Sequence, residues 1–195
     1  MRRTHAVLLI ALTLPVAAAE SQQQPSGPPA NPILTSFRNR TGVLRRNLAQ
    51  AFDSIPAATF GFKPTPAQLT VGYVAQHLAA DNYFFCNNFS DRKATLPAED
   101  TSTPDSVRAT WPKETLVAKL KAANAFCDEV MAAMDDSKAA ELITVTGQNG
   151  QTRQVPRINY LLGHALDLAD HYSQIANYMR LNNILPPTAL PRPRP

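Results

Sequence analysis

Hydrophobic residues recur three and four positions apart in four segments of the chain, which is the spacing of one face of an α-helix. These segments predict helices over residues 32–54, 70–89, 112–136 and 156–182, most of them bounded by a proline. The apolar positions of the two middle helices are Val71, Val74, Leu78, Phe85, Phe89, Leu116, Leu120, Ala123, Cys127, Val130 and Met134. Each stripe must be buried against another helix, so the pattern predicts an all-α protein and favours a four-helix bundle.

Two connections are longer than a simple turn. Residues 90–111 are rich in Pro, Asp, Ser and Thr, and predict a long polar crossover between the second and third helices. Residues 141–152 hold β-branched residues around Asn149 and Gly150, which fits a short hairpin or an irregular loop, and we favour the loop. A chain of 195 residues has room for one such domain, which we place at residues 31–187.

Residues 1–19 have the pattern of a signal peptide. Two arginines precede an apolar run at 6–14, and Ala17 and Ala19 then supply a small-residue cleavage site. We therefore expect a periplasmic or secreted protein. The apolar run is shorter than the roughly 20 residues that a membrane span needs, so we expect no stable membrane anchor.

Polar, proline-rich segments flank the predicted bundle. Residues 20–30 predict a flexible tether, and residues 188–195 a flexible and extended Pro-rich tail. The formal net charge of +4 includes the two arginines of the leader, and no stripe of Lys and Arg alternates with aromatic residues. This argues against nucleic acid as a partner and leaves an unidentified small molecule and a second copy of the chain.

The two cysteines of the chain, Cys86 and Cys127, both fall within predicted helices. In an exported protein such a pair commonly forms a disulfide. Two buried free thiols, packed as small hydrophobic side chains, are the other interpretation. The sequence leaves both open because it does not give the distance between the two side chains.

The fourth predicted helix carries the candidate chemistry. His164, Asp167 and His171 fall within an arc of about 60° and border the apolar stripe, with Tyr160 and Gln174 on the same strip. Imidazole and carboxylate groups are ligands for divalent metals. The first and last of these histidines lie about 10 Å apart along the axis, so another helix must complete a site.

His77 on the second predicted helix is the natural contributor. It flanks the apolar stripe, and Asp81, four residues later, could ligate an ion or orient the imidazole. A lone histidine at the edge of a core is commonly a hydrogen-bonded structural residue instead. The residues alone leave a metal site and polar core packing both open.

Two motifs give the chain a family resemblance. Gly-Phe-Lys-Pro-Thr-Pro at 61–66 followed by Val-Gly-Tyr-Val-Ala-Gln-His-Leu-Ala at 71–79 resembles the lead into the second helix of DinB-like proteins. His-Tyr-Ser-Gln at 171–174, with two prolines after the helix, resembles their last helix, which usually reads His-Arg-Gly-Gln. The resemblance extends from about residue 34 to 187 and implies a four-helix bundle with a long crossover.

The resemblance also implies a divalent metal bound by three histidines. The first maps to His77 and the last to His171, but the middle position is Asp167 here. Two histidines and a carboxylate can still bind zinc, which we expect, or nickel or manganese. His164 could be a fourth ligand or a neighbour of the site, and loss of metal affinity is the other outcome.

Two functions follow from this set of residues. The first is a metal-dependent hydrolase or transferase, with Tyr160, Tyr83 or Asp81 as acid, base or substrate contact. The alternative is a non-catalytic metal- or ligand-binding or structural module of the cell envelope. The substitution at the middle ligand and the absence of a Ser/His/Asp or Cys/His nucleophile pattern favour that alternative.

Overall fold

The computed structural model describes residues 30–147 and 149–191. The predicted signal peptide at 1–19 and the tether at 20–30, apart from its last residue, lie outside the described residues, as do the last four residues of the tail. The described part is mostly helical, as predicted. Within it, no helix combines the length and the apolar character needed to cross a bilayer.

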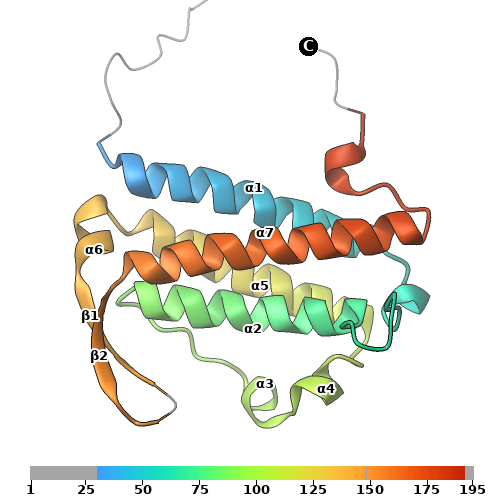
Figure 1. Ribbon diagram of the computed structural model, residues 1–195, viewed down its shortest axis with the longest axis horizontal. Helices are drawn as coiled ribbons and strands as arrows, with labels where there is room; N and C mark the ends of the chain where they lie inside the picture. The colour runs from blue at the N-terminus through green and yellow to red at the C-terminus, as the bar shows by residue number, and fades with distance from the viewer. Residues whose placement is uncertain (1–29, 148, 192–195) are drawn as a thin grey trace, which may run out of the picture.

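Four long helices make up most of the structure (Figure 1). They are α1 (Pro32–Ser54), α2 (Val71–Phe89), α5 (Lys113–Ala132) and α7 (Ile158–Leu181). The shorter elements of the described chain are η1 (Ala57–Thr59), α3 (Ala98–Ser102), α4 (Asp105–Arg108), α6 (Asp136–Ala140), β1 (Leu142–Thr146), β2 (Thr152–Pro156) and η2 (Pro187–Ala189). The predicted helices are confirmed to within a few residues at each end.

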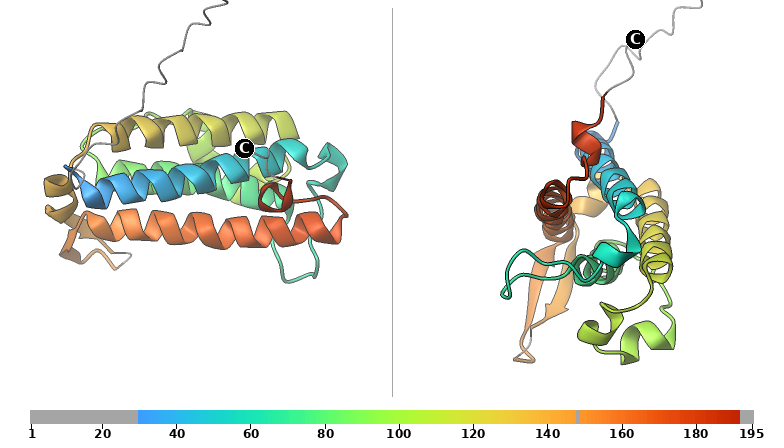
Figure 2. Two further views of the ribbon diagram at one scale, coloured as in Figure 1. Left: turned by 90° about the horizontal axis from the view of Figure 1, so that it is seen from above. Right: turned by 90° about the vertical axis from the view of Figure 1, so that its right-hand side faces the viewer.

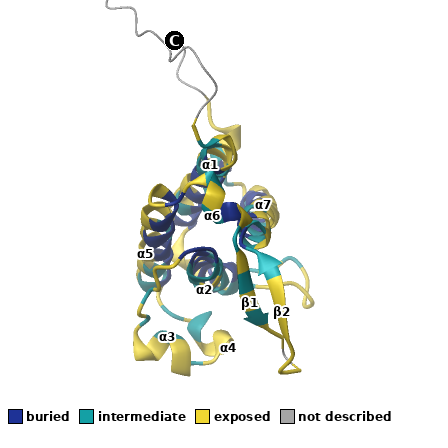
Figure 3. Ribbon diagram, turned by 90° about the vertical axis from the view of Figure 1, so that its left-hand side faces the viewer, coloured by how far each residue is buried: buried dark blue, intermediate teal, exposed yellow. Residues whose placement is uncertain are grey.

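The long helices lie side by side around a common core (Figures 2 and 3). Both α2 and α1 pack against α5 and α7. The ends of α1 are tied to their neighbours by polar contacts. The Asp136 carboxylate accepts hydrogen bonds from the first amides of α1, at 2.8 and 3.0 Å. At the other end, the Lys113 ammonium donates to two carbonyl oxygens at the end of α1, at 2.7 and 2.8 Å.

The interface between α2 and α7 is apolar along its centre. Val74 and Leu78 of α2 are fully buried, as are Leu168 and Ile175 of α7. Figure 3 shows the buried faces of the long helices turned toward one another. Burial of apolar surface stabilises the fold by about 25 cal/mol per Å². Each helix is therefore rotated about its own axis so that these residues face the core. The strip of α7 that carries Asp167 adjoins these buried residues and faces α2.

The segment after α6 is a β-hairpin, and our preference for an irregular loop there was wrong. β1 pairs with β2 in antiparallel register, with Ile143 opposite Val155. The turn is closed by a 2.8 Å hydrogen bond from the Gly147 amide to the Gln151 carbonyl, and Gly150 takes a φ of +75° that glycine tolerates. The β-branched residues of this segment therefore pair across two strands.

Segments outside the long helices also contain helical turns that the sequence pattern did not reveal. The polar crossover folds into α3 and α4, which begin directly after Pro97 and Pro104. The turn η2 begins at Pro187 and includes residues 188 and 189, the first two of the tail predicted to be extended. The Tyr172 hydroxyl holds η2 against α7 by donating to the Thr188 hydroxyl at 2.9 Å.

Cys86 and Cys127 form a disulfide that joins α2 to α5. Their Cα atoms are 5.5 Å apart, and both side chains are fully buried. This separation lies within the range that a disulfide requires. Of the two interpretations left open by the sequence, the structure has the bonded pair.

Candidate metal centre

Three potential metal ligands meet between α2 and α7. One donor atom each from His77, Asp167 and His171 lies within 4.8 Å of the others. The two imidazole rings are 4.9 Å apart between centroids and nearly perpendicular, at 80°. Asp167 Oδ1 lies 3.4 Å from His171 Nε2. The fold therefore brings together three of the four predicted ligands.

Helical spacing and the packing of α2 against α7 explain this meeting. Asp167 and His171 are four residues apart and so lie on one face of α7. Thr70 caps α2 by accepting a hydrogen bond from the Tyr73 amide at 3.1 Å, which places His77 in the second turn of the helix. α2 and α7 run in opposite directions, so this turn lies beside the C-terminal half of α7.

A chain of hydrogen bonds orients His171. The Tyr178 hydroxyl donates to the Leu69 carbonyl at 3.1 Å and accepts from Gln174 Nε2 at 2.8 Å. The amide of Gln174 is thereby oriented with its oxygen toward His171 Nδ1, 3.1 Å away. A carbonyl oxygen there accepts a hydrogen bond from Nδ1–H, so the His171 tautomer leaves Nε2 free to face Asp167 and an ion.

Two carboxylates share the site with the histidines. Asp81 Oδ2 lies 3.2 Å from His77 Nε2. Burial, together with the negative charge of Asp167, raises the pKa of Asp81, and the neighbouring His77 opposes this only in part. Asp167 Oδ2 is buried and has no hydrogen-bond partner among the described residues. Crowded carboxylates with an unpaired oxygen are an arrangement that a bound cation stabilises.

A proton at His171 competes with such a cation. Burial by itself would lower the pKa of His171, but the hydrogen bonds with Asp167 and Gln174 outweigh burial and raise it above its ordinary value. When His171 takes up a second proton, that proton is on Nε2, because Nδ1–H already faces Gln174. An ion at Nε2 and the second proton exclude each other, which would make ion affinity dependent on pH.

The donor set is one that could hold a divalent ion. Zinc bonds of 2.0–2.1 Å in a tetrahedral site place the ligand atoms about 3.3 Å apart, and the 3.4 Å between Asp167 Oδ1 and His171 Nε2 matches this. One ring nitrogen of His77 lies within 4.8 Å of the donor atoms of the other two residues. Three protein donors would leave a tetrahedral ion one position for water or substrate.

His164, the fourth predicted ligand, lies in a different environment. Its side chain is fully buried, its Nε2 is 2.8 Å from Asn82 Oδ1, and its ring stacks on Phe85 at 5.7 Å. Burial, with a further contribution from the positive charge of Arg45, lowers the pKa of His164 to about 3. The residue of α2 that faces His164 is Asn82. His164 therefore lies beside the bonded Cys86 and Cys127, and not beside His77.

Two of the three residues predicted to act as acid, base or substrate contact also lie away from the three ligands. Tyr160 packs against Phe84 with ring centroids 5.9 Å apart, and Tyr83 packs against Phe126 at 5.6 Å. Neither belongs to the group of ligands, and Asp81 alone of the three adjoins it.

Tyr178 is a supporting residue that was not predicted from the sequence; its hydroxyl supports His171 through Gln174. The spacing of His171, Gln174 and Tyr178 along one face of the last helix was a signal that could have identified this residue. Its second partner, the Leu69 carbonyl, precedes α2 and could not be inferred from that spacing.

Solved structures share this fold. A DinB-like protein from Bacillus cereus ATCC 10987 has a TM-score of 0.60 at 16% identity, over 78% of this chain and 95% of that one. A protein of Exiguobacterium sibiricum 255-15, described as a member of the DinB family, has a TM-score of 0.54 at 21% identity, over 77% and 91%. A mycothiol-dependent maleylpyruvate isomerase has a TM-score of 0.56 at 14% identity, over 74% of this chain and 60% of that one.

Sequence comparison agrees with the structural likeness. No curated protein matches the sequence. The family model of the DinB superfamily matches residues 41–175, which is more than half of the chain and includes His77, Asp167 and His171. The chain therefore belongs to the DinB superfamily.

Proposed function

We propose that this protein binds one divalent ion, with zinc as the first candidate, through His77, Asp167 and His171, and that it is a metal-dependent hydrolase or transferase. The observation that carries the proposal is the approach of donor atoms from two helices to within 4.8 Å of one another. The surrounding architecture in this proposal is a four-helix bundle of α1, α2, α5 and α7, which their mutual packing supports.

The residues around the ion have separate tasks in this proposal. A bound divalent ion with an open position would polarise a substrate or lower the pKa of bound water or a thiol. The Gln174 amide and the Tyr178 hydroxyl hold His171 in the ligating tautomer. Asp81, beside His77 and 26% exposed, is placed to orient that imidazole and to hold a proton next to it.

The choice between the two reaction classes rests on the neighbours and on the compartment. The mycothiol-dependent isomerase is evidence that a fold of this kind can act with a small thiol. We further propose that the protein is exported, which the leader pattern and the buried disulfide support. Small thiols are mostly cytosolic, so hydrolysis is the activity to test first. Mass measurement of the mature chain from the cell envelope tests export, with Glu20 as the expected first residue.

Elemental analysis of untagged protein tests the metal site. The wild type should contain a stoichiometric divalent metal, and Asp167→Asn should bind it at least tenfold more weakly because an anionic ligand is lost. Asp170→Asn is the matched control, since Asp170 lies on the same helix but is exposed. Equal metal content in the wild type and in Asp167→Asn would refute the assignment.

The non-catalytic alternative is favoured by one specific feature, the carboxylate of Asp167 where the resemblance implies a histidine. A metal-loaded protein without hydrolase or thiol-transferase activity, whose stability depends on the ion, would support this alternative. Activity that is lost on chelation and restored by zinc would support the enzyme.

A further inference from the structure

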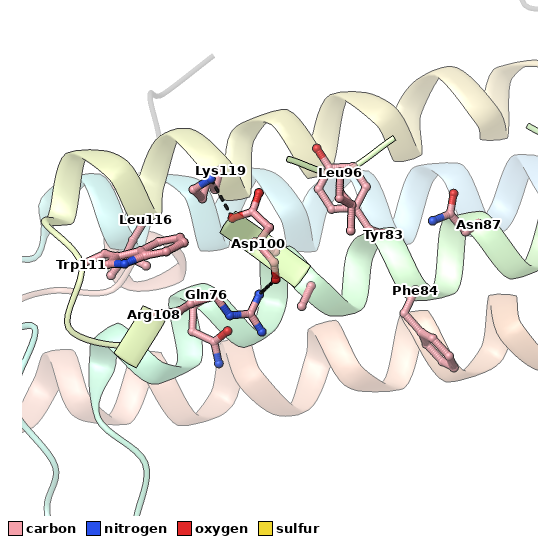
Figure 4. Close-up of a pocket in the computed structure, with 12 residues that line it drawn as sticks. Gln76, Tyr83, Phe84, Asn87, Leu96, Asp100, Arg108, Trp111, Leu116 and Lys119 are labelled. Atoms are coloured by element: carbon pink, nitrogen blue, oxygen red, sulfur yellow. Dashed lines mark hydrogen bonds and ion pairs between the residues drawn. The ribbon is translucent and has the colours of Figure 1, made fainter. Parts of the chain in front are cut away.

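A cavity lies between α2, the start of α5 and the crossover that carries α3 and α4 (Figure 4). Its volume is about 230 Å³. Its apolar walls are made by Ala79, Ala80, Phe84, Leu96, Trp111 and Leu116. Pockets for drug-sized molecules are roughly 300–1,000 Å³, so this smaller volume suits a molecule built on a single ring.

Two polar side chains on the α2 wall of the cavity have unused hydrogen-bond donors. The Tyr83 hydroxyl makes no hydrogen bond in the described part of the chain. Asn87 Oδ1 accepts a hydrogen bond from the Ala94 amide at 2.7 Å, which leaves Nδ2 without a partner among the described residues. Both side chains are half-buried, and neither donor atom is closed off from solvent. A ligand in the cavity can therefore reach both donors.

The two donors can bind one acceptor. Tyr83 and Asn87 are four residues apart, so they lie on the same face of α2, one turn from each other (Figure 4). Burial and the negative charge of Asp100 raise the pKa of Tyr83, and Lys119 opposes this only in part, so the hydroxyl keeps its proton and can donate. A carbonyl oxygen has two lone pairs and can accept one hydrogen bond from each side chain.

The charged groups around the cavity are paired with one another. The Lys119 ammonium lies 2.7 Å from Asp100 Oδ1 and 2.9 Å from Glu99 Oε1. Arg108 donates to the Asp100 carbonyl at 2.8 Å and forms an ion pair with Asp105. Figure 4 shows Asp100 between the two cations. A charged ligand would lose its hydration without meeting a free counter-charge among these residues, which favours a neutral ligand.

We infer that this cavity binds a neutral compound made of one apolar ring and a carbonyl group, whose oxygen accepts hydrogen bonds from Tyr83 and Asn87. The apolar walls of the cavity contact the ring. The compound occupies a second site, so the inference goes beyond the proposed metal-dependent reaction.

The cavity is separate from the proposed metal ligands. Gln76 and Ala80, which line it, are direct chain neighbours of His77 and Asp81, but successive residues of a helix point about 100° apart. His77 and Asp81 face the metal centre instead. Ligand binding in the cavity does not require an ion at the metal centre.

The experiment uses acetophenone as the probe and Trp111 as the reporter. Trp111 lines the cavity and is the chain's single tryptophan, so its indole N–H gives one resolved resonance in ¹⁵N-labelled protein. Acetophenone should shift this resonance with a Kd of about 1–10 mM, as expected for a small fragment. Benzoate and benzylammonium carry charges of opposite sign on a similar ring, and both should bind at least about fivefold more weakly.

Two variants remove one donor each. Tyr83→Phe should weaken acetophenone binding about fivefold because one hydrogen bond is lost. Asn87→Asp keeps the acceptor for the Ala94 amide but removes the Nδ2 donor, so it should weaken acetophenone binding by a similar factor. Toluene has no acceptor and should bind both variants like the wild type. Both variants preserve the size of the side chain and should stay folded.

Tyr160→Phe is the matched control. The Tyr160 hydroxyl also has no hydrogen-bond partner among the described residues, but Tyr160 does not line the cavity. This variant should bind acetophenone like the wild type. His171→Ala should also bind acetophenone with the wild-type Kd.

The inference is overturned if acetophenone does not move the Trp111 resonance, or if benzoate or benzylammonium binds as tightly. It is also overturned if Tyr83→Phe or Asn87→Asp binds acetophenone like the wild type, or loses affinity for toluene to the same extent. Weaker binding in Tyr160→Phe or loss of binding in His171→Ala would contradict the placement of the site. A failure of metal binding at His171 leaves these expectations unchanged, so the two proposals are refuted by different results.

Discussion

α7 carries two buried histidines two turns apart, and α2 gives them opposite surroundings. His171 lies beside the carboxylate of Asp167 at the partly exposed end of the interface. His164 is fully buried against Asn82 and Phe85, next to the disulfide. The partners raise the pKa of the first histidine, and burial lowers that of the second to about 3.

The difference shows that residue type and helical spacing do not by themselves identify a metal ligand. A histidine near carboxylates, with one ring nitrogen held by a hydrogen bond, exchanges a proton for an ion. A histidine in apolar surroundings, with its ring nitrogen bonded to an amide, stays neutral and contributes packing. We call the region around His171 the carboxylate end of the α2–α7 interface and the region around His164 its disulfide end.

The largest expected effect on stability comes from breaking the disulfide end. The bond joins residues 41 apart in sequence, and closing a loop of that length stabilises a fold by about 4 kcal/mol in the chain-entropy model. The Cys86→Ala, Cys127→Ala double variant should lose about this free energy of unfolding in urea but keep its metal content. A change below about 1 kcal/mol would contradict the role given to this bond.

His164 should make stability depend on pH. In the unfolded chain it takes up a proton near its ordinary pKa of 6.5, whereas in the folded protein it does so only near pH 3. The unfolded state therefore binds more protons between these values, and the free energy of unfolding should fall by about 1.4 kcal/mol per pH unit as the pH decreases from about 6.

His164→Gln isolates this contribution, because glutamine can donate to Asn82 Oδ1 but does not titrate. The difference between the wild type and the variant in urea-unfolding free energy should change with pH by the stated slope. A difference that stays constant between pH 4 and 7 would show that His164 is not held neutral by burial.

A smaller effect, on zinc affinity, is expected when the hydrogen bonds that orient His171 are weakened. Tyr178→Phe removes the hydroxyl that orients Gln174, and we expect zinc affinity to fall about tenfold in a competition titration. Tyr172→Phe is the matched control, because that hydroxyl, on the same helix, bonds to Thr188 instead. Equal affinities in the two variants would remove Tyr178 from the orienting chain.

Features that depend on local periodicity could be predicted from the sequence. The long helices follow from apolar spacing, and the strip of Asp167 and His171 follows from their separation of four residues on α7. The pairing with His77 was expected from the family motifs and from the need for a second helix. The β-hairpin was judged wrongly because short β-branched segments around an Asn-Gly pair fit a loop and a hairpin equally well.

Features that depend on the register between helices could not be predicted. Whether His164 meets Asn82 or the other ligands is decided by how far α7 is shifted along α2. The cavity beside Gln76 depends on the crossover folding back over α2 through α3 and α4, and residues 90–111 carry no periodic pattern that predicts this. Long polar connections are placed by tertiary contacts that a linear pattern does not encode.

The contrast between the two histidines is tested most directly by the metal-to-protein ratio of two untagged variants purified side by side. His171→Ala should lose the stoichiometric divalent ion, and His164→Gln should retain it at the wild-type level. Metal retained by His171→Ala, or lost equally from both folded variants, would contradict an ion-binding carboxylate end and a purely structural disulfide end.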